Sequence, residues 1–478
     1  MSASLKRLAA AALLLLLPGL AVAAEIDGTQ LSLWWALPFA GILLSIALCP
    51  ILLPHFWHLH FGKVAAFWGL AFLMPCALTF GASTAGGVII HALVGEYIPF
   101  IILLFALYTI SGGILIWGNL HGSPALNTGL LALGAVLASL MGTTGAAMLL
   151  IRPLIKANDN RRHNVHVIVF FIFIVANIGG GLTPIGDPPL FLGFLKGVGF
   201  LWTLQHMLPL VAFACGLLLA LFYAIDSYYF RKEGVLPFDK TPDSPIKIHG
   251  KRNIPLLIAA VACVVLSGVW RPGVAINLGA VHWELQNLVR DIALIGLALL
   301  SLKLTPKPVR AGNDFSWGPI QEVAKLFAGI FVAMAPAIAI LRAGEHGALA
   351  DLVRLVFGPD GQPRDHMFFW MSGSLSAFLD NAPTYLVFFN LAHGDAAYLM
   401  HSMPSTLLAI SAGSVFMGAM SYIGNAPNFM VKAVAEDRGI SMPSFFGYMA
   451  WSLAILLPLF VIMTWVFFHP LYGMGLAQ

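Results

Sequence analysis

The stretch Asn177-Ile-Gly-Gly-Gly-Leu-Thr-Pro-Ile-Gly-Asp-Pro-Pro189 interrupts a long apolar segment near its middle. A helix does not continue through it, because the glycines weaken helical structure and the three prolines remove donors and clash with the preceding turn. In hydrocarbon, irregular backbone is tolerated only where protein buries it or a cavity hydrates it. We therefore predict that a spanning helix unwinds here and lines a site, with Asp187 capping the second half-helix.

The composition of the whole chain supports a membrane setting. Of its 478 residues, 59% are hydrophobic and only 10% are charged, whereas soluble domains carry about 25% charged residues. Apolar blocks such as 31–53 and 451–468 approach the ~20 residues of a spanning helix, and a β-barrel would show short alternating segments instead. The sequence predicts an all-α polytopic membrane protein embedded in a lipid bilayer. The net charge of +4 indicates no nucleic-acid partner, and the four isolated cysteines indicate neither disulfides nor a metal site.

The first residues have the order typical of a secretory signal peptide. Lys6 and Arg7 precede the apolar run 8–20, and Ala21-Val-Ala-Ala24 supplies small residues at cleavage spacing. We predict a signal peptide over 1–24, with an uncleaved first helix as the alternative. Together with the membrane class, this predicts a multi-pass protein of the bacterial inner membrane.

Two transmembrane halves, 31–225 and 254–478, are predicted on either side of a cytoplasmic linker, 226–253. Each half offers single spans, then a re-entrant helical hairpin (within 126–155 and 367–391), then an interrupted span (164–200 and 404–436) and a last span. Threading them alternately places sixteen basic residues inside and five outside, in agreement with the positive-inside rule. The asymmetry holds only if both hairpins enter and leave on the same face.

The two halves match in sequence at one fixed offset, which we call the repeat offset. It places Thr183-Pro-Ile-Gly-Asp187-Pro-Pro-Leu-Phe191 on Ser421-Tyr-Ile-Gly-Asn425-Ala-Pro-Asn-Phe429, and the stretch 140–149 on 378–387, so that the hairpin tips superpose. The first tip approaches from inside and the second from outside. We predict two inverted repeats, about 64–225 and 288–468, each with a re-entrant hairpin and a broken helix, which is the architecture of secondary transporters.

Four segments should therefore meet at the midplane. Asp187 is costly at this depth, which favours a functional role beyond capping. The second hairpin tip, Leu379-Asp380-Asn381-Ala-Pro383-Thr384, has the same cap-and-proline pattern. At the first tip, for Thr143 and Thr144, ordinary helix packing is an equal alternative. The candidate ion or substrate ligands are Asp187, Asp380, Asn381, Thr183, Asn425, Thr384, Ser421, Thr143, Thr144, Asn177, Gly186 and Gly424, and this core contains no lysine or arginine.

These motifs resemble the ion transporter superfamily, which contains citrate carriers, divalent-anion/sodium symporters and NhaD-type sodium/proton antiporters. Gly181-Leu-Thr-Pro-Ile-Gly-Asp-Pro-Pro189 and Leu379-Asp-Asn-Ala-Pro-Thr384 look like the antiporter forms. The resemblance implies that Thr183, Asp187, Asp380, Asn381 and Asn425 belong to the ion site, and that the protein is a homodimer with a scaffold and a moving transport domain. Both tips differ from the Ser-Asn-Thr pattern of the carboxylate carriers, which argues against citrate.

Two buried aspartates favour a cation over an anion in this site, because a dianion within ~5 Å of an uncompensated carboxylate is repelled by several kcal/mol. A proton or Na⁺ bound to Asp187 and Asp380 would neutralise the site in turn, and competition between them suffices for antiport. We therefore expect a transporter and no enzyme, with Na⁺ and H⁺ as transported ions and no resident cofactor. The alternatives are a cation-coupled symporter of citrate, a dicarboxylate or another oxyanion, and a channel-like or sensory membrane module.

Overall fold

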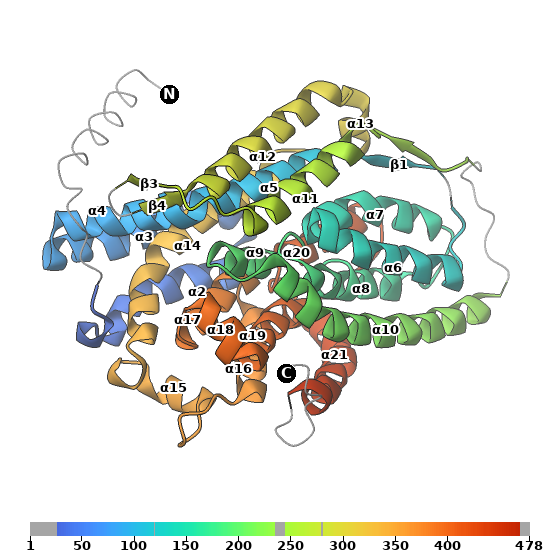
Figure 1. Ribbon diagram of the computed structural model, residues 1–478. Helices are drawn as coiled ribbons and strands as arrows, with labels where there is room; N and C mark the ends of the chain where they lie inside the picture. The colour runs from blue at the N-terminus through green and yellow to red at the C-terminus, as the bar shows by residue number, and fades with distance from the viewer. Residues whose placement is uncertain (1–25, 119, 235–243, 279–280, 469–478) are drawn as a thin grey trace.

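A computed structural model describes residues 26–118, 120–234, 244–278 and 281–468, so the predicted signal peptide lies outside the described residues. The chain is almost entirely helical, which confirms the predicted all-α polytopic class (Figure 1). Within the described ranges, nine helices are long and apolar enough to cross a membrane, or ten if the bent pair 396–402 and 404–420 forms one span.

Six helical segments form a group that we call the frame. The frame helices are α2 (Leu37–Leu52), α3 (Pro54–Phe80), the continuous run α4 (Ala82–Ile90), π-helical η4 (His91–Tyr97) and α5 (Ile98–Ser111), then α11 (Asn253–Val269), α12 (Leu285–Leu304) and α14 (Gly318–Arg342). The two halves of the chain interlock here. α5 packs on α11 and α12 of the second half, side by side along one edge in Figure 1, whereas α14 packs on α2 and α3 of the first.

The interrupted helices, the hairpins and the helices packed on them form what we call the central bundle. From the first half they are α6 (Pro124–Met141), α7 (Thr143–Ala157), α8 (Val165–Ile174), η5 (Ile178–Leu182), α9 (Pro188–Leu195) and α10 (Phe200–Glu233). From the second half they are α16 (Asp365–Phe378), α17 (Asn381–Leu391), α19 (Pro404–Phe416), η7 (Met417–Met420), α20 (Ala426–Asp437) and α21 (Phe445–Phe467). The half-helices α9 and α20 lie near the middle of the molecule (Figure 1).

Short elements connect these groups. They are η2 (Gly28–Gln30), η3 (Leu33–Ala36), α13 (Lys307–Gly312), η6 (Gly344–His346), α15 (Ala350–Val356), α18 (Ala396–Ser402), and two antiparallel pairs, β1 (Leu115–Trp117) with β2 (Lys247–His249) and β3 (Ala275–Leu278) with β4 (Val281–Glu284). Within the predicted linker, α10 continues past 225 to Glu233 and β2 pairs with β1.

The elements of the central bundle recur at the repeat offset. The N-cap of α9 is Asp187 and that of α20 is Asn425, while the N-cap of α7 is Gly142 and that of α17 is Asp380. Both broken helices pass through a short 3-10 turn, η5 or η7, before the break. The structure thus contains the hairpins and the interrupted helices in both halves, and their opposite orientation in a membrane stays a prediction.

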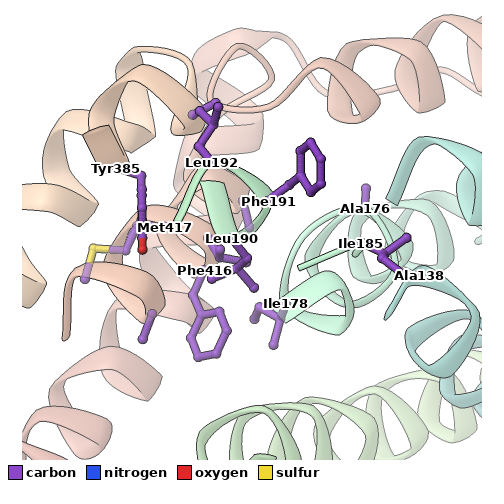
Figure 2. Packing of buried hydrophobic residues seen from close by; sticks show 14 of the residues in the cluster. Ala138, Ala176, Ile178, Ile185, Leu190, Phe191, Leu192, Tyr385, Phe416 and Met417 are labelled. Carbon is purple, nitrogen blue, oxygen red and sulfur yellow. The ribbon is translucent and has the colours of Figure 1, made fainter. Parts of the chain in front are cut away.

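Buried apolar side chains fill the space between the two halves of the bundle. Figure 2 shows part of this core, where Ile178 of η5, Leu190 of α9, Tyr385 of α17 and Phe416 of α19 gather. A carbon added at Gly193 would lie 2.3 Å from the Tyr385 hydroxyl oxygen. Close packing of this kind fixes α9 against the second hairpin.

The inverted orientation predicts opposite labelling of equivalent loops. In a background in which the four native cysteines are replaced by serine, Lys247→Cys should react with an impermeant thiol reagent only from the cytoplasmic side. Ala397→Cys and Arg271→Cys should react only from the periplasmic side, and all three positions are exposed in the structure. Labelling of Ala397→Cys from the cytoplasmic side would contradict the inverted topology.

Candidate functional site

The carboxylate of Asp187 lies at the centre of the bundle, with the residue 1% exposed. It receives one hydrogen bond from each of the three other interrupted segments. Thr143 Oγ1, at the first hairpin tip, donates to Oδ1 over 3.0 Å, and Asn425 Nδ2, in the second broken helix, donates to the same oxygen over 3.2 Å. Asn381 Nδ2, at the second hairpin tip, donates to Oδ2 over 2.5 Å. The four predicted midplane segments therefore converge on one acid.

Asp187 does not cap α9 as the residue order suggested. It occupies the N-cap position, with extended backbone, but its side chain accepts no hydrogen bond from the first turn of the helix. The side chain makes no cap because Thr143, Asn381 and Asn425 already donate to its two carboxylate oxygens. The side chain faces across the break instead of back along its own helix.

An asparagine network extends the site toward the first break. Asn425 Nδ2 also donates to Ala176 O over 3.1 Å and to Asn177 Oδ1 over 3.2 Å. Asn177 Nδ2 donates to Asn428 Oδ1 over 2.7 Å, and Asn428 Nδ2 donates to Gly418 O and Ser421 O. Asn428 was not among the predicted site residues, although its position directly after Pro427 in the second broken helix was the available signal.

Two hydroxyl groups bond backbone carbonyls near the two breaks, and among the described residues neither donates to Asp187. Thr183 Oγ1 donates to Ser139 O over 2.5 Å, and Ser421 Oγ donates to Ala377 O over the same distance. The two donors, and likewise the two acceptors, are counterparts at the repeat offset. Ser139 Oγ in turn donates to Gly179 O. These bonds satisfy carbonyls at the ends of α6, η5 and α16, so Thr183 and Ser421 support the shape of the site.

Among the described residues, Asp380, Thr384 and Thr144 make no hydrogen bond to Asp187. Asp380 is half-buried and caps α17, its Oδ1 accepting from Ala382 N over 3.0 Å, and Thr384 Oγ1 donates to Asp380 O. Thr144 is half-buried in the first turn of α7.

Two glycines permit the close approach of backbone at each break. Gly186 O accepts from Thr143 N over 2.9 Å, which holds the first hairpin tip against the break. A carbon added to Gly186 would lie 2.1 Å from Gly180 O, and one added to Gly424 would lie 2.6 Å from Gly418 O. The same approach recurs at the repeat offset, so both breaks fold back on themselves in the same way.

An ion pair links the site-bearing helix to the frame. Lys196, the C-cap of α9, contacts Glu96 in π-helical η4, and His91 Nε2 lies 3.3 Å from the same carboxylate oxygen. Glu96 was not among the predicted residues. It anchors Lys196 at the C-terminal end of α9, which is the end opposite to Asp187.

Fold and site together define a polytopic helical membrane protein of the transporter class. The profile of the family described as "Putative citrate transport" matches residues 28–468, and the chain belongs to this family. It is also similar to two uncharacterized transporters, one from Mycobacterium bovis and one from Mycobacterium tuberculosis. Each is 26% identical over 328 residues, which cover 67% of this chain and 71% of the relative. These matches point to a transporter rather than an enzyme, within an ion-transporter type of family.

The glycine contacts predict that the breaks tolerate no side chain. Gly186→Ala and Gly424→Ala should each lower the stability of the purified protein by about 1–3 kcal/mol, because the new methyl group meets backbone oxygen that cannot move aside. Thermal unfolding in detergent measures this. Gly129→Ala is the matched control, since a carbon there meets nothing within 4 Å, and a helix favours alanine over glycine. Equal stability of Gly186→Ala and the control would contradict the described break.

Proposed function

We propose that the chain is a secondary transporter that exchanges Na⁺ for H⁺ at a site centred on Asp187. The observation that carries this proposal is the environment of that carboxylate. It is buried, and its three hydrogen-bond donors, Thr143, Asn381 and Asn425, are all neutral. Among the described residues no lysine, arginine or histidine is paired with it.

An unpaired charge in such a place has a large desolvation cost. A proton removes the charge and a bound cation compensates it, so each form of Asp187 is stable only with one of the two ions. Because both ions use the same carboxylate, they compete for it. Exchange across the membrane follows if the loaded and protonated forms change sides and the empty anionic form does not.

Oxygen atoms are available around Asp187 for a hard cation. Asn381 Oδ1 is buried without a hydrogen-bond partner, in a residue that is 1% exposed. The carbonyl of Ile185 faces the first hairpin tip, 3.6 Å from where a carbon on Gly142 would stand. Unwound carbonyls at half-helix ends are the usual Na⁺ ligands in transporters with broken helices. In this proposal Asp187 and Asn381 are the principal ligands, and Asp380 contributes a nearby charge.

A second candidate is cation-coupled symport of citrate or another carboxylate. The family description supports it, and so do the N-termini of α7, α9, α17 and α20, which converge on the site and attract anions. In that case Asp187 would bind only the coupling ion. We place antiport first because no cationic side chain among the described residues contacts Asp187 or its three donors.

The exchange can be tested with everted membrane vesicles. Adding Na⁺ should release protons from vesicles that contain the wild-type chain, and Asp187→Asn should abolish the release while the protein remains in the membrane, because an amide neither exchanges a proton nor neutralises a cation. Asp351→Asn is the control, since that side chain is fully exposed. Uptake of labelled citrate without Na⁺-driven proton release would establish the symport candidate, and full exchange by Asp187→Asn would contradict both.

The position of Asp380, which makes no hydrogen bond to Asp187 among the described residues, predicts a milder effect. Asp380→Asn should keep coupled exchange but lower the affinity for Na⁺ by about an order of magnitude, because the variant removes a nearby negative charge without removing a ligand. The same substitution relieves like-charge repulsion, so the pH profile should shift toward lower pH. Na⁺ affinity measured against pH in purified protein tests this. Unchanged affinity and an unchanged profile would place Asp380 outside the site.

A further inference from the structure

A buried ionic cluster lies at the far end of the central bundle from the break, where α8 begins and α10 ends. Arg161 Nη1 lies 2.6 Å from Asp226 Oδ1, and Arg161 Nε lies 3.3 Å from Glu233 Oε2. The side chains of Arg161 and Asp226 are fully buried and that of Glu233 is 2% exposed. His166 Nε2 lies 2.8 Å from Asp226 Oδ1.

Neutral groups complete the cluster. Asn127 Nδ2 of α6 donates to Asp226 Oδ2 over 2.9 Å, and the backbone N–H of His163 donates to Glu233 Oε1 over 2.7 Å. The cluster therefore joins α6, α8 and α10. α8 runs directly from His166 to the break at Asn177, and α10 packs on η5, so the cluster fixes the base of the first broken helix.

Among the described residues, the second repeat has no such cluster. At the repeat offset, the positions of Arg161, His166 and Asp226 are occupied by Leu399, Pro404 and Thr464, and the position of Glu233 falls beyond the repeat. The second repeat forms the same kinds of elements as the first, and it does so without these charged residues. The cluster therefore serves something other than the basic architecture.

The charges inside the cluster do not balance when His166 is neutral. One guanidinium faces two carboxylates, which leaves a net charge of −1, and protonation of His166 brings the sum to zero. Burying an uncompensated charge is unfavourable, and a balanced, hydrogen-bonded set costs far less. Histidine is the side chain whose charge ordinarily changes between about pH 5 and 8. Binding of one proton therefore favours the arrangement in which these four side chains are in contact.

The remaining titratable groups around α8 do not supply the missing positive charge. α6, η5 and η7 carry none. The Tyr229 ring of α10 packs against the His166 ring, with 4.9 Å between centroids. The other charged or titratable groups nearby are the exposed Asp159, Arg162 and His163 before α8, the exposed Arg231 and Lys232 at the end of α10, and Lys432, Glu436 and Asp437 at the end of α20, where Lys432 is paired with Glu436.

We propose that the cluster of Arg161, His166, Asp226 and Glu233 is a proton-binding clamp. A proton on His166 fastens the start of α8 to the end of α10, and loss of that proton at alkaline pH loosens the base of the broken helix. The clamp binds its proton away from Asp187 and does not depend on the transport reaction, so it goes beyond the proposed function.

The clamp predicts a pH-dependent stability that belongs to His166. Between about pH 5.5 and about pH 8, the melting temperature of the purified full-length wild-type protein should fall by about 2 °C more than that of His166→Gln. Glutamine keeps an N–H toward Asp226 but cannot be protonated. His249→Gln, on exposed β2, is the control and should behave as the wild type. Equal pH dependence of His166→Gln and the wild type would overturn the proposal.

A second variant should reverse the sign. Glu233→Gln leaves one guanidinium and one carboxylate, so the cluster is balanced with neutral His166 and carries +1 when His166 is protonated. Acid should then destabilise this variant relative to alkaline pH, with Glu436→Gln as the matched control. If His166→Gln does not fold, the direction in which the stability of Glu233→Gln changes with pH is the deciding result. If that direction is the same as in the wild type, the clamp proposal is overturned. Both measurements apply equally in an Asp187→Asn background, so failure of the transport proposal leaves their outcome intact.

Discussion

The buried carboxylate of Asp187 is the constraint on which the centre of this structure depends. Three segments that are distant in sequence each donate one hydrogen bond to it, through Thr143, Asn381 and Asn425. An ionised acid in this environment is stable only if its charge is compensated. In the proposed function a proton or a bound cation supplies that compensation, so the chemistry that we propose starts from the way the bundle closes around this carboxylate.

The unwound backbone is the second condition for this arrangement. Breaking a helix inside a membrane exposes carbonyls that hydrocarbon cannot satisfy. Here Thr183 and Ser421 bond the carbonyls at the ends of α6 and α16, while Asn428 bonds two carbonyls of the second break. Gly186 and Gly424 let each break fold back on itself. Small polar side chains thus bond carbonyls that water would bond in a surface loop, and the glycines allow the backbone to come close enough.

Ion pairs link the central bundle to the frame and to the segment that precedes α14. Lys196 of α9 contacts Glu96 of the frame, and Arg152 of α7 lies 3.1 Å from Asp314, which precedes α14. Of the two helices concerned, α9 begins directly after Asp187 and α7 begins at Thr143. Any movement of the site relative to the frame must therefore carry or break these pairs. The interlocked packing of α5 and α14 across the halves keeps the frame itself in one piece.

The sequence by itself determined the membrane class and predicted the hairpins, the broken helices and the internal repeat, because apolar length, proline and glycine act locally. It also placed Asp187, Thr143, Asn381 and Asn425 among the candidates, since polar residues at membrane depth are costly. Only the tertiary structure decided that Asp187 faces its three donors and leaves its own helix uncapped, and that Arg161 is buried with Asp226 and Glu233. Such pairings join residues from opposite halves of the chain or from separate helices, and a side chain's choice between local cap and distant partner depends on packing that no local pattern records.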